Sequence, residues 1–263
     1  TDRNARIKNS GNINMQDYGL VTLVAPTVVN EGVIAVTAGD INLAAGDEFT
    51  IDMFGDGLVN FAVTNDQKAL MLEQSGSLSA KGGHVAMTVQ DANNILNNVV
   101  NMNGLIDADT VEISSTGDIT LGSSSLILAN GNVDMNADGN MLISGGIHTN
   151  GGNYNADAGG SFVLTSGGQI NTNAYIQATN HDLMYDEFVD VDNEFENGPT
   201  PSFAPALLGP IEPKVSINAD NVQISGHINA NGAVDVTSNT DILVNGQINA
   251  QGNEGRPQTI NGL

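Results

Sequence analysis

Carboxylates are the residues in this sequence with the clearest capacity for chemistry. Six of them lie within residues 186–196, close enough to meet around one ion. Carboxylate oxygens are hard ligands of the kind that Ca²⁺ prefers. Asp186, Asp190, Asp192 and Glu194 are therefore candidate calcium ligands, and calcium is the cofactor that such a site would hold. The alternative, which we favour, is a solvated acidic loop without metal.

A pair of carboxylates can also cleave a glycosidic bond, one acting as acid and the other as base or nucleophile. Several aspartates lie beside a glycine or within two residues of one, among them Asp40, Asp47, Asp118, Asp138 and Asp157. Aspartate in such places is ordinary turn chemistry. Residues 82–213 contain no Lys or Arg to assist a lyase. We predict no catalytic residues and no enzyme activity; a polysaccharide lyase or glycosidase is the alternative.

The four histidines and the absent cysteines add no metal or nucleophile motif. His84, His148, His181 and His227 form no pair spaced by two or four residues. His148 and His227 each adjoin an isoleucine of the repeat described below, so alternation along a strand points them to the surface. With no cysteine, the chain has no disulfide, thiolate ligand or thiol nucleophile.

Charge and hydropathy exclude several partners. The net charge is −23, and only seven residues are Lys or Arg. Nucleic acid and anionic lipid need clustered cations, so neither is an expected partner. No run of 18 apolar residues exists to span a membrane as a helix, and we expect no membrane insertion. The polar first eight residues do not resemble a signal peptide, and we expect the chain to be a processed piece of something longer.

A recurring phrase sets the fold expectation: glycine, any residue, Ile or Val, any residue, Ala or Asn. Ile228 and Ile248 are 20 residues apart, and Ile13 and Ile34 are 21 apart. Period-two alternation inside a period near 20 predicts an all-β solenoid of short stacked strands, with about 20 residues per coil. The expected inward residues share the place after glycine: Ile13, Ile34, Ile106, Ile147, Ile170, Ile228 and Ile248.

Three segments depart from the repeat. Residues 64–75 are polar and are expected to form a loop or a departure from the coil. Residues 91–100 fit a short helix or a buried strand equally well, because brief apolar runs are ambiguous. Residues 183–214 combine the acidic run with five of the seven prolines, which cannot donate to a strand ladder. That composition predicts an excursion from the coil.

These observations give four regions and ten to twelve coils. Residues 49–52 and 55–63 are counted among the coil strands. The regions are residues 1–182 as the N-terminal solenoid, 183–214 as the acidic, proline-rich excursion, 215–250 as the C-terminal coils and 251–263 as a tail.

A series of segments within residues 9–115 has the order and spacing of a known family. They are YGLVTLVAP at 18–26, VVNEGVIA at 28–35, INLAAGD at 41–47, DGLV at 56–59, GGHVAMT at 82–88, Leu96, VVN at 99–101 and GLIDA at 104–108. They resemble the filamentous-haemagglutinin-type exoproteins of bacterial two-partner secretion. The chain has no Asn-Pro dipeptide, which the early secretion motifs of that family contain, and residues 116–263 match in repeat style only.

The resemblance implies a right-handed parallel β-helix, export through an outer-membrane pore partner, and a place outside the cell or on the bacterial surface. It implies the role of an adhesin shaft or fibre-forming subunit, with a host cell, neighbouring cell or glycan as partner. A glycan- or calcium-binding module on residues 183–214 is a further alternative.

The distribution of charge also suggests self-association. Arg3, Arg6 and Lys8 are three of the seven cations, while the remainder of the chain is heavily acidic. A solenoid leaves an open strand edge at each end. A basic end meeting an acidic end makes a contact that does not close, which predicts head-to-tail filaments.

Overall fold

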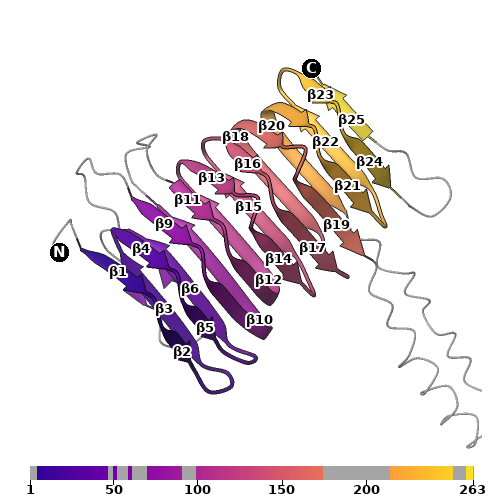
Figure 1. The fold of residues 1–263 in the computed structure, drawn as a ribbon. Helices are drawn as coiled ribbons and strands as arrows, with labels where there is room; N and C mark the ends of the chain where they lie inside the picture. Colours follow the sequence, from indigo (N-terminus) through magenta and orange to yellow (C-terminus); the bar gives the residue numbers. More distant parts are fainter. Residues whose placement is uncertain are drawn as a thin grey trace, which may run out of the picture.

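The computed structural model describes residues 5–46, 50–51, 59–60, 70–90, 99–173, 214–250 and 259–262. Every regular element in these residues is a strand, and 23 strands join one sheet whose pairings are all parallel. Figure 1 shows them as a stack that runs from β1 at one end to β25 at the other. The prediction of an all-β chain with stacked parallel strands is confirmed.

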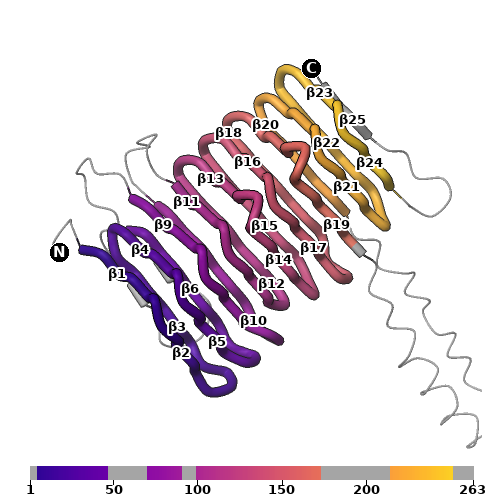
Figure 2. The backbone as a smooth tube through the Cα atoms, viewed as in Figure 1, coloured from indigo at the N-terminus to yellow at the C-terminus, as the bar shows by residue number. Residues whose placement is uncertain are grey.

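Each coil contributes one strand to each of three faces, which Figure 2 shows as successive turns of one tube. The first face contains β1 (Arg6–Asn9), β4 (Thr27–Asn30), β9 (Met71–Gln74), β11 (Val99–Met102), β13 (Asp118–Leu121), β16 (Met141–Ile143), the second half of β18 (Tyr154–Leu164), the second half of β20 (Val215–Ile224) and β23 (Ile242–Val244). The second face contains β2 (Asn12–Asn14), β5 (Val33–Ala35), the first half of β10 (Ser77–Val89), the first half of β12 (Leu105–Ser115), β14 (Leu126–Ala129), β17 (Gly146–Asn150), β19 (Gln169–Asn173), β21 (His227–Ala230) and β24 (Gln247–Ala250). The third face contains β3 (Leu20–Ala25), β6 (Asp40–Ala45), the remaining halves of β10, β12, β18 and β20, β15 (Val133–Ala137), β22 (Val234–Ser238) and β25 (Thr259–Gly262).

The described residues therefore form nine coils, fewer than the ten to twelve expected. The difference arises partly at residues 49–63, which the alternating pattern counted as coil strands. Instead, β7 (Thr50–Ile51) pairs antiparallel with β8 (Val59–Asn60), apart from the main sheet. Alternation alone cannot tell a rung of the stack from a local hairpin, since both place side chains with period two. At ~4.8 Å per strand, nine coils stack to about 40 Å.

One ladder on the second face carries the isoleucines of the repeat. Parallel registers place Ile13, Ile34, Ile106, Ile147, Ile170, Ile228 and Ile248 in a single line, with Leu78 and Ile127 completing it. The ladder is fully buried from Ile34 to Ile228, and its two end members are half-buried against the core. The stack therefore buries these side chains against the coils above and below.

The glycine that precedes this ladder is explained by close backbone approach between coils. A Cβ built on Gly104 would lie 2.2 Å from the carbonyl oxygen of Gly76, and one on Gly246 would lie 2.0 Å from that of Gly226. No real Cβ fits there. Where Ser125 replaces the glycine, its Oγ donates to the Gly122 carbonyl oxygen at 2.7 Å.

A short amide ladder replaces apolar packing in the first three coils. Asn9 Nδ2 donates to Asn30 Oδ1, and Asn30 Nδ2 donates to Gln74 Oε1, each at 2.7 Å. Asn30 and Gln74 are fully buried. Gln74 lies in β9, so the expected loop at 64–75 was wrong for residues 71–74, whose apolar Leu72 faces the core.

The strand ladders continue in register on either side of residues 174–213. Tyr154 of β18 pairs with Val215 of β20, and Ile170 of β19 pairs with Ile228 of β21. The predicted excursion lies outside the described residues up to 213, as do residues 91–98; Val99 and Val100 begin β11. In the predicted tail, β25 adds a rung to the third face. No helix in the described segments has the length and hydropathy to cross a membrane.

We expect Tyr154→Phe to improve stability at alkaline pH. Tyr154 is fully buried, and among the described residues its hydroxyl hydrogen-bonds to the sulfurs of Met135 and Met141, at 3.7 and 4.0 Å. Burial raises the pKa of Tyr154 above its usual value. Keeping the Tyr154 hydroxyl neutral therefore contributes stability at pH values below ~10, the pKa of tyrosine in the unfolded chain. That stability is lost as the pH rises further. Thermal melts from neutral to strongly alkaline pH should show less loss in the variant.

The matched control for that experiment is Tyr18→Phe, because Tyr18 is 84% exposed. It should melt like the parent at every pH. A Tyr154→Phe variant that loses stability at high pH as steeply as the parent would contradict the assignment.

Candidate functional site

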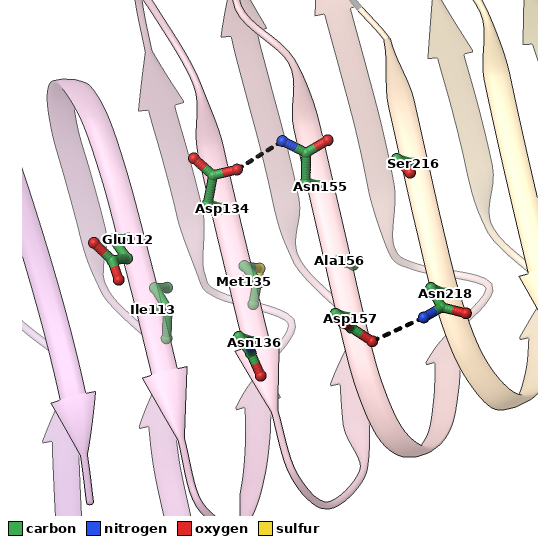
Figure 3. Close-up of a pocket in the computed structure, with 10 residues that line it drawn as sticks. All are labelled: Glu112, Ile113, Asp134, Met135, Asn136, Asn155, Ala156, Asp157, Ser216 and Asn218. Atoms are coloured by element: carbon green, nitrogen blue, oxygen red, sulfur yellow. Dashed lines mark hydrogen bonds between the residues drawn. The ribbon is translucent and has the colours of Figure 1, made fainter.

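The candidate site is a shallow groove of about 390 Å³ on the third face, across four successive coils. Figure 3 shows the side chains that line it, from β12, β15, β18 and β20. The polar residues that line it are Glu112, Asp134, Asn136, Asn155, Asp157, Ser216 and Asn218.

Strand alternation places these polar side chains outside and the apolar ones inside. In β15, Val133 and Met135 are buried while Asp134 and Asn136 are exposed, and the neighbouring strands follow the same order. Parallel pairing then aligns the outward residues in two rows along the stack. The first row is Glu112, Asp134, Asn155 and Ser216, and the second is Ser114, Asn136, Asp157 and Asn218.

Hydrogen bonds between coils fix two carboxylates in place. Asn155 Nδ2 donates to Asp134 Oδ1 at 2.6 Å, and Asn218 Nδ2 donates to Asp157 Oδ1 at 3.1 Å, as Figure 3 shows. Bonds from an amide to an ionised carboxylate are charge-assisted and hold both side chains in one rotamer. The second oxygen of each carboxylate stays available as an acceptor.

The groove is anionic. Glu112 and Asp134 are direct partners across adjacent strands, and Asp157 lies one coil further on. Lys214, which directly precedes β20, makes an ion pair with Asp235 in the following coil. Elsewhere in the described stack, Lys8 pairs with Glu31 at 2.7 Å and Lys81 with Asp107 at 3.2 Å. The groove therefore repels anions and favours neutral or cationic groups.

The four calcium candidates, Asp186, Asp190, Asp192 and Glu194, lie outside the described residues. Within the described segments, no three His, Asp or Glu side chains gather in a way that suits a metal ion.

The described histidines lie apart from one another and from the groove lining. His84 Nδ1 lies 2.8 Å from Thr110 Oγ1, and His148 Nδ1 lies 3.3 Å from Asn171 Nδ2. His227 is exposed on the second face, and His181 falls outside the described residues. Their contacts are with neutral polar groups.

Sequence reasoning missed the groove because it took Asp157 for a turn residue. The structure places Asp157 within β18, facing outward between buried Ala156 and Ala158. The usable signal was a pair of polar residues separated by one apolar residue, repeated in four strands. Glu112 with Ser114 and Asp134 with Asn136 are two instances.

Chemically, the groove offers carboxylate and amide oxygens as acceptors and amide and hydroxyl groups as donors. Such a set binds sugar hydroxyls or amines.

No protein-family model matches the chain, and neither the curated proteins nor the solved structures contain a match to it.

Proposed function

We propose that this chain is an extracellular structural or adhesive β-solenoid, acting as the shaft of a bacterial surface adhesin or as a fibre-forming subunit. The observation that carries the proposal is the registered stack of nine coils with a continuous apolar core. Each coil contacts its neighbours, so the form extends by repetition, as a shaft requires. The filamentous-haemagglutinin-type resemblance of residues 9–115 supports a right-handed parallel β-helix and export through an outer-membrane pore partner.

The terminal coils of the described stack support lengthwise growth. Ile7 and Ile13 at one end, and Ile242 and Ile248 at the other, are only partly buried against the core. A further coil, from the same polypeptide or from a second copy, would cover these side chains. Open parallel edges offer the backbone groups for that contact.

We expect the purified chain to associate head to tail in low salt. Arg6 is exposed in β1, where Lys8 pairs with Glu31 of the next coil, and the last coils carry exposed Asp241. Attraction between such ends weakens as salt shortens the Debye length to ~3 Å at 1 M. Light scattering should show mass that grows with protein concentration in low salt and falls in high salt. A strictly monomeric species at low salt and high concentration would rule the filament out.

The groove on the third face favours a second candidate function, recognition of a glycan. Its rows repeat at the ~4.8 Å spacing of adjacent strands, close to the length of one linked pyranose ring. An extended peptide presents same-side residues about every 6.6–6.8 Å and does not match this spacing. The anionic lining favours binding of neutral or amino-sugar chains and disfavours uronic-acid or sulfated chains, which carry the same sign of charge.

We expect Asp157→Ala to weaken binding of neutral or amino-sugar oligosaccharides about tenfold, as for the loss of one charged hydrogen bond. Asp220→Ala is the matched control. Asp220 also accepts a hydrogen bond from an asparagine amide, Asn239 Nδ2 at 2.8 Å, but it does not line the groove. Calorimetric titration with each oligosaccharide measures both variants. Equal losses in the two variants, or no binding by the parent, would remove the groove as a glycan site. Release of shorter sugars during the titration would favour the enzyme alternative.

A further inference from the structure

We infer that Asn150–Gly151 is a site of spontaneous deamidation, which converts the Asn150 amide to aspartate or isoaspartate in the folded chain. Five Asn–Gly pairs have side chains that the structure describes, and all five lie at or beside corners of the coil. They are Asn103–Gly104, Asn130–Gly131, Asn150–Gly151, Asn231–Gly232 and Asn245–Gly246. The structure distinguishes them by the hydrogen bonds that the glycine N–H makes.

The reaction needs only this dipeptide and water. The Gly151 nitrogen forms a bond to Asn150 Cγ, the Cγ–Nδ2 bond breaks, and Nδ2 leaves as ammonia with the proton from the Gly151 N–H. Water then adds to either carbonyl of the cyclic imide and opens it. The products are an aspartyl or an isoaspartyl residue, and no atom is oxidised or reduced. Glycine permits the ring closure because it has no Cβ beside the attacking nitrogen.

At Asn150 the reacting groups are accessible. Asn150 is the exposed last residue of β17, and Gly151 is partly exposed with a φ of 90°. Within the described residues, neither the Asn150 side chain nor the Gly151 N–H makes a hydrogen bond. Base can therefore remove the amide proton, and the side chain is free to turn towards the nitrogen.

Two of the other pairs are held by hydrogen bonds. Gly131 N–H donates to the Asp109 carbonyl oxygen at 2.6 Å, and Asn130 Nδ2 donates to Asp109 Oδ1 at 3.0 Å. Gly246 N–H donates to the Ile224 carbonyl oxygen at 2.9 Å. Each bond must break before the ring can close, so these pairs react more slowly.

The remaining two pairs are shielded in another way. Gly104 and Gly232 have no acceptor for their N–H groups among the described residues, but both glycines are buried. Burial limits access of base to the amide proton. Asn150–Gly151 is thus the described pair that combines an exposed amide, a partly exposed glycine and an unbonded N–H.

Conversion would disturb the corner between β17 and β18. Thr149 Oγ1 donates to the Gly152 carbonyl oxygen at 2.6 Å inside this corner, and Asn153 N–H donates to Asn132 Oδ1 at 3.0 Å. Isoaspartate inserts a methylene group into the main chain at this point and adds a negative charge. Both hydrogen bonds depend on the present length of the corner, so ageing should lower the melting temperature.

The test is peptide mapping by mass spectrometry after incubating the full chain at physiological temperature and mildly alkaline pH. Asn150 should convert about 30-fold faster than Asn130, which two hydrogen bonds protect, and about fivefold faster than Asn245, which one protects. In urea the five pairs should convert at similar rates. Folded-chain rates at Asn130 or Asn245 that equal or exceed the rate at Asn150 would overturn the inference.

The Asn150→Gln variant supplies a second readout. The freshly prepared variant should melt like the parent, because the Asn150 side chain makes no hydrogen bond within the described residues. After incubation, the parent should lose melting temperature and the variant should keep it. Equal loss in both would show that ageing acts elsewhere and would contradict the assignment of the damage to this corner.

Discussion

Replacing Ile106 by aspartate will destabilise the stack by at least about 4 kcal/mol, and the variant is expected to be largely unfolded. Ile106 is fully buried, with Leu78 above it and Ile127 below it in the ladder. A carboxylate there has no cation to pair with among its ladder neighbours. Thermal or urea melts followed by circular dichroism measure the loss.

Two further variants keep that prediction informative. Ile106→Ala should fold and lose about 2–5 kcal/mol, the usual cost of truncating a buried isoleucine. Leu128→Asp adds the same charge to an outward position of the next coil, where the side chain is 36% exposed, and should change stability little. Melting of Ile106→Asp like the parent would show that Ile106 does not face the core.

Gly104→Ala is also expected to destabilise the stack, although it adds a single methyl group. The new Cβ would lie 2.2 Å from the Gly76 carbonyl oxygen, which accepts the backbone bond from Leu105 N–H at 2.9 Å. The coils must separate to admit it, at a cost of about 1–3 kcal/mol or more. Urea melts give the change in unfolding free energy.

Gly167→Ala is the matched control for that variant. A Cβ on Gly167 would meet its nearest neighbour, the Ser144 carbonyl oxygen, at 3.5 Å, which is ordinary contact. We expect a change within ~0.5 kcal/mol. If both alanine variants melt alike, close approach between coils is not the reason for the repeated glycine.

Much of the fold follows from spacing that the sequence displays. The separation of Ile13 from Ile34 and of Ile228 from Ile248 equals one coil, and both pairs are direct partners in the ladder. Glycine marks the ladder because backbones approach there. Leu78 and Ile127 escaped the pattern for local reasons: leucine replaces isoleucine in one coil, and Ser125 replaces glycine in the other.

The pairing of strands that are distant in the sequence was harder to predict from the sequence than the alternation within one strand. Residues 50–51 and 59–60 alternate like rungs but pair with each other. Residues 71–74 look polar because Glu73 and Gln74 stand together, yet Gln74 is buried and satisfied in part by Asn30. A buried amide ladder requires partners from three coils, and single-strand patterns do not reveal which coils are adjacent.

Predicting the groove from the sequence also requires knowing which coils are adjacent. Asp134 and Asn155 are 21 residues apart, and Asp157 and Asn218 are 61 apart, so their hydrogen bonds depend on the number of residues in each coil. The first separation is one ordinary coil. The second includes residues 174–213, a length that no repeat predicts.

The central claim, an extracellular solenoid on a bacterial surface, is tested most directly by immunogold electron microscopy of intact cells that produce the protein. The antibody should be raised against the folded chain. Label on the outside of unpermeabilised cells, along fibres or at the outer membrane, is the result that the proposal predicts. Label that appears only after the cells are permeabilised would contradict it.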